Sequence, residues 1–376
     1  MYIRDLSLLN FKNFEETELA FSPKLNCFIG NNGVGKTNLL DAVYYLSFCK
    51  SFLNSIEAEN IRHGEEFLAI QGVYVRNDQE EVIHCGLKKG QSKQFKRNKK
   101  EYSKLADHIG LLPLVMVSPS DISLILGGSE ERRKFMDSVI SQYDRKYLDV
   151  LLRYNRALLQ RNNLLKNFAQ IQRFDYGMLE AWDDQLIVLG KEINVKRAEF
   201  IQKLLPVFQK FYELVSQGHE IVELVYESAL NDHDFQELIR EALPRDRAAQ
   251  HTTVGIHKDD LHFKLGDYPM KKLGSQGQKK TYLVALKLAQ FDFICKISGL
   301  KPILLLDDIF DKLDSIRVEQ IIKLVSEEHF GQIFITDTNR EHLDHIIVSA
   351  GADYKIFHIE DGQVAEIRGS EKEVVL

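Results

Sequence analysis

The segment Gly30–Thr37 constrains the fold of this chain most, because it reads Gly-Asn-Asn-Gly-Val-Gly-Lys-Thr. It matches the pattern G-x-x-x-x-G-K-[ST], in which backbone N–H groups of a glycine-rich loop surround a phosphate at the start of a helix. An apolar run at 25–29 precedes the segment, and apolar residues at helical spacing follow it at 39–48. A strand, a phosphate loop and a helix in this order predict an α/β fold with a parallel sheet.

The same loop predicts a set of nucleotide-binding residues. Lys36 is expected to reach the β- and γ-phosphates of ATP, and the Thr37 hydroxyl is expected to bind Mg²⁺. The alternative, an ordinary glycine-rich turn, is disfavoured because a strand and an amphipathic helix flank the motif. The other expected ATP-binding positions belong to the loop and the first helical turn: Gly30, Asn31, Asn32, Gly33, Val34, Gly35 and Asn38.

A second candidate element is Ile303–Asp308, where four apolar residues precede two aspartates. Asp307 is expected to complete the Mg²⁺ shell, and Asp308 to orient or deprotonate the attacking water. A buried strand that ends in acidic turn residues is common on its own, but beside a phosphate loop it is the expected second half of a nucleotide site. The long interval between Lys36 and Asp307 indicates an insertion within the ATPase domain.

A third motif, Leu273–Lys280, places Ser275, Gly277 and Gln278 at the expected start of a helix. It resembles the signature of ABC-type ATPases, in which a serine and a glycine N–H bind the γ-phosphate of ATP held by another subunit. A plain helix cap is the alternative, but the two other motifs in this order favour the signature. The resemblance implies a composite site and an ATP-dependent homodimer, with Asp311–Asp314 in the place of a dimer-contact loop.

Helical periodicity interrupts the α/β pattern in the middle of the chain. We expect an ATPase head in two pieces, residues 1–128 and 251–376, separated by a mostly helical lobe at residues 129–250. Strands are predicted at 67–75, 82–87, 252–265, 303–306 and 333–336, and helices from about 277 and about 316.

These stretches together resemble the RecF family, the SMC-like ABC ATPases of bacterial recombinational repair. Ile256 and Lys258 depart from that family's Gly-Pro-His-Arg-Asp-Asp-Leu stretch, whereas the aspartate pair suits it better than relatives that carry Asp-Glu. The long heptad repeats of SMC proteins are missing from the insertion. The further stretches that carry the resemblance are Asn10–Phe14, Leu112–Asp121, Gly127–Asp137 and Gly255–Leu261.

The resemblance implies an ATP-induced dimer that clamps duplex DNA at junctions with single-stranded gaps, and a slow, DNA-stimulated ATPase that releases it. It also implies a role in DNA replication and SOS-linked gap repair, with RecO and RecR as partners in loading RecA. Two competing hypotheses stay open. An ABC-type subunit with a membrane partner predicts a switch histidine, and a P-loop ATPase acting on a small molecule leaves Ser275–Gln278 unexplained.

Two positions depart from the ABC pattern. The segment Val115–Asp121 contains no glutamine that could sense the γ-phosphate, so none is assigned. After the apolar strand residues that end at Ile335 the chain reads Thr336-Asp337-Thr338 in place of the switch histidine. Thr336 or Asp337 is therefore the candidate for that role.

Charge is unevenly distributed along the chain, although the net charge is −6. Residues 131–173 hold ten basic and four acidic residues, and residues 88–100 hold seven basic residues and no acidic one. A polyanion responds to the local field, so both segments are candidates for DNA contact, with solvated helix and hairpin surfaces as the alternatives.

Cysteine and hydropathy patterns bound the remaining possibilities. The four cysteines are scattered and the histidines lack metal-ligand spacing, so no zinc site is expected. Charges at Arg4 and Asp5 come too early for a signal peptide, and no apolar run approaches the length of a membrane span. We therefore expect a soluble, cytoplasmic protein that does not contact a membrane.

Overall fold

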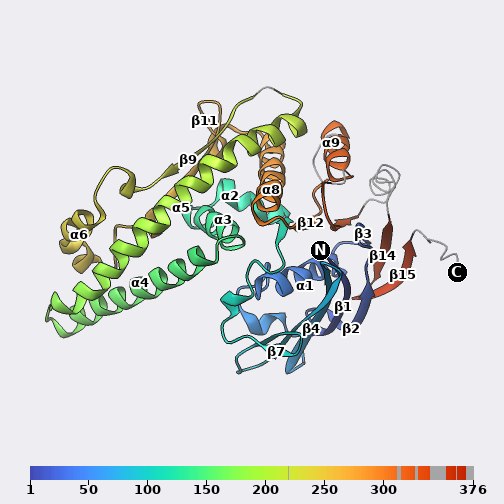
Figure 1. The fold of residues 1–376 in the computed structure, drawn as a ribbon, viewed down its shortest axis with the longest axis horizontal. Coiled ribbons are helices and arrows are strands. Elements are labelled where there is room, and N and C mark those ends of the chain that lie inside the picture. The colour runs from blue at the N-terminus through green and yellow to red at the C-terminus, as the bar shows by residue number, and fades with distance from the viewer. Residues whose placement is uncertain (219, 311–314, 327–328, 339–352, 361, 370–376) are drawn as a thin grey trace. The chain divides into compact units, whose positions relative to one another are not determined.

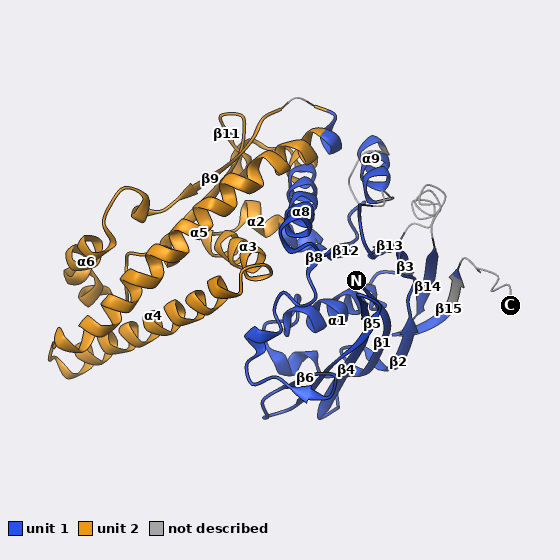
Figure 2. Ribbon diagram, in the orientation of Figure 1, with its two compact units in different colours: residues 1–121, 214–217, 280–376 blue, residues 122–213, 218–279 orange. Residues whose placement is uncertain are grey.

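A computed structural model (Figure 1) describes residues 1–218, 220–310, 315–326, 329–338, 353–360 and 362–369. The chain divides into two compact units (Figure 2), of which the first comprises residues 1–121, 214–217 and 280–376 and the second residues 122–213 and 218–279. The second unit begins before the predicted lobe boundary at 129 and continues past 250, so it includes the signature segment. The predicted dimer-contact loop Asp311–Asp314 lies outside the described residues.

The first unit contains a six-stranded, mostly parallel sheet of order β15-β14-β3-β13-β12-β8. All neighbours in it are parallel except β14 and β15. Continuous apolar runs such as Ile303–Leu306 are typical of parallel strands covered on both faces, and the strands predicted at 303–306 and 333–336 are confirmed. The strand bounds are β3 (Leu25–Ile29), β8 (Leu114–Val117), β12 (Ile303–Asp307), β13 (Ile333–Asp337), β14 (Tyr354–Glu360) and β15 (Gln363–Gly369).

A second, antiparallel sheet of the same unit has the order β2-β1-β4-β5-β6-β7. Burial alternates along β4, as expected for a sheet with one face in the core. Its hairpin of β5 and β6 carries much of the basic segment 88–100. The bounds are β1 (Tyr2–Phe11), β2 (Phe14–Ala20), β4 (Phe67–Arg76), β5 (Gln79–Lys88), β6 (Gln94–Arg97) and β7 (Lys100–Glu101).

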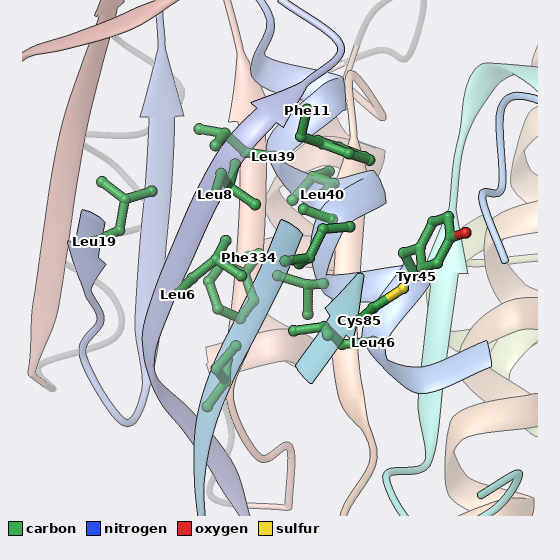
Figure 3. Close-up of a cluster of buried hydrophobic side chains, with 14 of the residues drawn as sticks. Leu6, Leu8, Phe11, Leu19, Leu39, Leu40, Tyr45, Leu46, Cys85 and Phe334 are labelled. Atoms are coloured by element: carbon green, nitrogen blue, oxygen red, sulfur yellow. The ribbon is translucent and has the colours of Figure 1, made fainter. Parts of the chain in front are cut away.

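The core of the first unit joins both sheets to helix α1 (Lys36–Phe48), as Figure 3 shows. Leu40 of α1, Phe11 of β1 and Phe334 of β13 are all fully buried members of this cluster. Phe21 meets Phe334 edge-on at a centroid distance of 4.8 Å, an arrangement that aromatic pairs favour. Because α1 starts inside the phosphate loop, packing of α1 also fixes the orientation of that loop.

Long helices dominate the second unit, as the periodicity predicts. Asp144 and Asp234 cap α4 and α6 by accepting backbone N–H groups, which satisfies donors that a helix start leaves unpaired. The helices of the middle of the chain are α2 (Ile122–Leu126), α3 (Ser129–Ser141), α4 (Arg145–Ile171), α5 (Gly177–Ser216) and α6 (Phe235–Ala249).

A small sheet of order β11-β10-β9 completes the second unit. The strand predicted over 252–265 is wrong for its first half, because Gly255 has φ +119° and starts a 3₁₀ turn at Ile256–Lys258. The remaining bounds are β9 (Val222–Glu227), β10 (Asp260–Leu265), β11 (Tyr268–Pro269), α7 (Met270–Leu273), α8 (Gln276–Ser298) and α9 (Ser315–Ser326). Short 3₁₀ turns also occur at Glu57–Asn60, Leu105–Asp107, Pro119–Asp121 and Ala229–Asn231.

A buried ionic cluster ties three parts of the second unit together. Arg161 of α4 is fully buried and donates to Asp183 of α5 and Asp246 of α6, at 2.6 Å in each case, and to Thr252 at 2.9 Å. Burial raises the pKa of Asp183, and the neighbouring guanidinium opposes that rise. Removing the arginine alone would leave two buried carboxylates without their cation.

We predict that Arg161→Met lowers the free energy of unfolding by about 3–5 kcal/mol, the usual cost of stranding buried charge. Arg156→Met is the matched control, since Arg156 lies on the same helix but is exposed, and it should change stability by no more than about 0.5 kcal/mol. Urea unfolding followed by circular dichroism measures both. Equal effects of the two substitutions would contradict a stabilising role for the cluster.

His108 makes the stability of the first unit depend on pH. The ring is fully buried, with Nε2 2.7 Å from the Leu46 carbonyl and Nδ1 3.1 Å from the Tyr102 hydroxyl. Burial lowers the pKa of His108 from 6.5 to about 4. The unfolded chain therefore binds an extra proton between these two values, and stability falls as the pH drops through that window.

We predict that this histidine alone costs about 3 kcal/mol of stability between pH 6.5 and pH 4. His108→Gln removes the titrating group, so the stability of the variant should fall less steeply with acid than that of the natural chain. Urea unfolding of both proteins across this pH range is the measurement. Identical slopes would show that the folded protein does not depress the pKa of His108.

Candidate nucleotide-binding site

The loop Gly30–Thr37 connects β3 to α1, and each of its glycines stands where a side chain would either clash or strain the backbone. A Cβ atom on Gly30 would lie 2.3 Å from the Ile359 carbonyl oxygen, and one on Gly35 would lie 2.4 Å from Asn13 Nδ2. Gly33 and Gly35 also have φ values of +84° and +113°, which favour glycine. The glycine positions of the motif are therefore required by this loop conformation.

Lys36 directs its charge into the loop. Its Nζ donates to the carbonyls of Gly30 at 2.7 Å and Asn31 at 2.9 Å, and the residue is 5% exposed. A cation held at the start of a helix, beside N–H groups that the helix leaves unpaired, attracts anionic groups such as phosphates.

Three parallel strands bring the acidic half of the site to the loop. β3, β13 and β12 are neighbours in the sheet, so their carboxyl ends meet at one edge. There Asp307 Oδ1 accepts hydrogen bonds from the Thr37 hydroxyl at 2.9 Å and from the Thr336 hydroxyl at 2.7 Å. Burial raises the pKa of Asp307, and these two hydrogen bonds with the charge of Lys36 oppose that rise.

Thr336 links the two aspartates. Besides donating to Asp307, its hydroxyl accepts the backbone N–H of Asp308 at 3.0 Å. Asp308 has φ +44°, a left-handed conformation in which the chain turns sharply after β12. Thr336, one of the two candidates for the switch position, thus forms hydrogen bonds with both aspartates.

The oxygen atoms at this edge suit a magnesium ion. Thr37 and Asp307 offer a hydroxyl and a carboxylate that already lie within hydrogen-bond distance of each other. Mg²⁺ is usually held by one or two carboxylates together with substrate phosphates and waters. Among the described residues no group of three or more His, Cys, Asp or Glu side chains gathers as an all-protein metal site.

The segment after β8, where ABC ATPases place a sensing glutamine, has another arrangement here. Asp121 accepts the backbone N–H of Ser118 at 2.8 Å and pairs with Lys287 of α8 at 2.7 Å. Asp121 and Lys287 are both buried. This ion pair connects the end of β8 to α8.

The predicted signature residues lie in the second unit. Ser275 and Gln278 cap the start of α8 reciprocally: Ser275 Oγ accepts the Gln278 N–H at 3.1 Å, and Gln278 Oε1 accepts the Ser275 N–H at 2.9 Å. Gly277 follows in the first turn of α8, and Leu273, two residues before Ser275, is 64% exposed. The capping box leaves this helix start at the surface.

Asn13 supports the loop, although sequence reasoning assigned it no role in the site. Its Nδ2 donates to the Val34 carbonyl at 2.9 Å and its Oδ1 accepts from Asn38 Nδ2 at 2.7 Å. The signal in the sequence is its place in Asn10–Phe14, one of the stretches that carry the family resemblance. A Cβ atom on Gly35 would clash with the Asn13 side chain, so Asn13 also explains why position 35 excludes a side chain.

Within the described part of the chain, no helix combines the length and apolar character that a bilayer crossing requires.

Comparisons with known proteins show which family this chain resembles. A family model described as "RecF/RecN/SMC N terminal domain" matches residues 2–363. The DNA replication and repair protein RecF of Phocaeicola vulgatus is 58% identical over 368 residues, which cover 97% of this chain and 98% of that protein.

Solved structures give the same result. One described as "Structure of the recombination mediator protein RecF-ATP in RecFOR pathway" has a TM-score of 0.87 at 30% identity and covers 98% of each chain. A Smc head domain of Pyrococcus furiosus, 19% identical, has a TM-score of 0.59 over 99% of this chain and 97% of that one, and shares the fold alone. The predicted SMC-like ABC ATPase head is confirmed. The chain belongs to the RecF family of DNA replication and repair proteins.

Proposed function

We propose that this RecF-family chain is an ATP-dependent DNA clamp whose closing and opening follow the binding and hydrolysis of ATP. The observation that carries the proposal is the meeting of Thr37, Asp307 and Thr336 at the mouth of the phosphate loop. The site brings together two hydroxyl groups, a carboxylate and the lysine of the loop. This combination suits a nucleoside triphosphate with its metal ion.

The predicted site residues of the first unit each have a role in this proposal. Lys36 and the N–H groups of Gly30–Asn38 bind the phosphates, and Thr37 with Asp307 holds Mg²⁺, which neutralises charge that develops on the phosphate oxygens. Asp308, fixed through Thr336, orients the attacking water and accepts its proton.

The second unit supplies the other half of a composite site. Ser275, Gly277 and Gln278 lie at the exposed start of α8, where backbone N–H groups favour binding of an anion. In the proposal they bind the γ-phosphate of ATP held by a second copy of the chain, so that ATP joins two subunits. Two cytoplasmic subunits joined in this way would enclose duplex DNA beside a single-stranded gap.

The outer face of α4 is the proposed DNA contact. Arg156 and Lys166 are exposed and form no ion pair with any residue that the structure describes. Residues 131–173 offer less positive charge to DNA than their composition indicates. Arg132, Arg133 and Arg161 bind acceptors inside the second unit. The remaining arginines and lysines of α4 favour a polyanion through their local field.

The pathway partners follow from the relatives. The solved relative is described as a recombination mediator of the RecFOR pathway, which supports RecO and RecR as partners. In the proposal, the outcome of their joint action is RecA loading in SOS-linked repair. An ATPase acting on a small molecule, or an ABC-type ATPase with a membrane partner, is the alternative. The first leaves the exposed signature of the second unit unexplained. The second predicts a switch histidine where this chain reads Thr336-Asp337-Thr338.

We predict that ATP hydrolysis per subunit rises with protein concentration and with added duplex DNA, because each site needs two chains. Asp308→Asn should slow hydrolysis about 100-fold while ATP still binds, since only the group that accepts the proton is removed. Light scattering should find this variant as a dimer in ATP. Constant specific activity with a persistent monomer would contradict the clamp and favour the small-molecule hypothesis.

We predict that Arg156→Gln with Lys166→Gln weakens duplex binding and reduces the slope of log affinity against log salt by about 2, one unit for each phosphate that is no longer neutralised. Lys203→Gln on α5 is the control, since Lys203 is exposed but lies beside Glu199. Fluorescence anisotropy at several salt concentrations measures the slope. An unchanged slope in the double variant would place the DNA on another surface.

A further inference from the structure

Two family stretches, Gly127–Asp137 and Gly255–Leu261, have no part in the nucleotide chemistry proposed above, yet they contact each other in the second unit. Arg132 of α3 donates from Nε to Asp260 Oδ1 at 2.7 Å and from Nη2 to Oδ2 at 2.9 Å. This two-point contact fixes the relative direction of both side chains, which a lysine in place of Arg132 would not do.

The same guanidinium also binds the turn between α2 and α3, residues 126–129, which we call the α2–α3 corner. Its Nη1 donates to the carbonyls of Leu124 at 3.2 Å and Gly127 at 3.1 Å, so it satisfies acceptors that the end of α2 leaves unpaired. The arginine side chain is only 11% exposed. Burial opposes ionisation of Asp260, but the hydrogen bonds from Arg132 and from the Leu261 N–H keep the pKa of Asp260 below its usual value.

Asp260 is the first residue of β10, and the signature follows β10 within ten residues of its last residue, Leu265. The chain passes from β10 through β11 and the four-residue helix α7 to Gly274 and Ser275. Gly274 leaves no room for a side chain, because a Cβ atom there would lie 2.2 Å from the sulfur of the buried Met270. A displacement at the start of β10 would therefore reach Ser275 through β11 and α7, which the buried Met270 fixes to the second unit.

A second contact reaches the signature from the same corner. Lys271 of α7 donates to the Gly127 carbonyl at 3.2 Å, the same oxygen that accepts from Arg132. The α2–α3 corner is thus joined to β10 by Arg132 and to α7 by Lys271. These two connections converge on the segment that ends at Ser275.

We propose that Arg132 is the positioning residue of the signature: it holds β10 and α7 so that Ser275 and the start of α8 meet ATP bound by the other subunit. The inference rests on the proposed composite site, to which the second unit contributes Ser275. It makes the position of Ser275 depend on Arg132. Arg132 acts through Asp260 and Gly127 and touches no ATP itself.

The test separates ATP binding from ATP-dependent dimerisation. The variants are made in the full chain carrying Asp308→Asn, so that hydrolysis does not remove the dimer. Arg132→Lys keeps the charge but cannot bind Asp260 at two points, and Lys271→Ala removes the second connection at an exposed position. Lys134→Ala is the control, because Lys134 is exposed on the same helix and pairs only with Glu130 and Glu131 among described residues.

We predict that Arg132→Lys raises the dissociation constant of the ATP-bound dimer at least about tenfold and that Lys271→Ala raises it about threefold. Binding of ATP to a single subunit, measured with a fluorescent ATP analogue, should stay within about twofold of the parent, as should both quantities in the Lys134→Ala control. Sedimentation at several protein concentrations gives the dimer constant.

Each other outcome overturns the inference. Unchanged dimerisation in Arg132→Lys and Lys271→Ala would show that the corner does not position the signature. Equal losses of ATP binding and dimerisation, or a large fall in the thermal midpoint of Lys271→Ala, would show a merely structural role. A parent chain that stays monomeric in ATP would overturn the proposed function, and this inference with it.

Discussion

Asp307 is the point on which the first unit depends, because its buried carboxylate joins three elements through two hydroxyl groups. Thr37 comes from α1, Thr336 from β13 and the acid itself from β12. Burying a carboxylate is expensive unless hydrogen bonds replace the lost water, so the site is stable only when all three elements are in register. The site therefore depends on the packing of α1 against β12 and β13 in the core of the first unit.

The second unit uses buried charge in a different way. Arg161 and Arg197 are both fully enclosed, and each binds carboxylates from separate segments. Arg197 donates to Asp137, to Asp259 and to the Ile256 carbonyl, so it fixes the 3₁₀ turn that precedes β10. Two long helices with apolar stripes can pack against each other in several registers. A buried guanidinium that has specific carboxylate partners favours one of these registers.

Sequence reasoning succeeded where local residues determine the outcome. The phosphate loop, the strand before Asp307 and the helix after Ser275 each have a pattern that lies within a few residues, and each forms at the expected place. It failed where distant segments decide. The strand predicted from 252 starts only at Asp260, because Gly255 and its buried neighbours impose a turn.

The same limit applies to the site and to the basic segment. Asn13 reaches Val34 only because two strands and a helix fold together, and no local pattern encodes that contact. Likewise Arg132 and Arg161 look in the sequence like surface charges available to a polyanion. Their carboxylate partners lie far along the chain, at Asp260, Asp183 and Asp246, so composition overstated the positive surface.

The phosphate loop is held at both ends, which has a consequence for how chains of this kind can change in length. Gly30 lies against the Ile359 carbonyl and Gly35 against Asn13, so the loop has no slack to absorb an inserted or deleted residue. A residue inserted in the first turn of α1 would also turn the helical residues after it by about 100° relative to the loop, so that the core face of α1 would point elsewhere. Length changes should instead collect in turns such as residues 88–92, where every side chain is exposed and the hairpin can lengthen without disturbing the core.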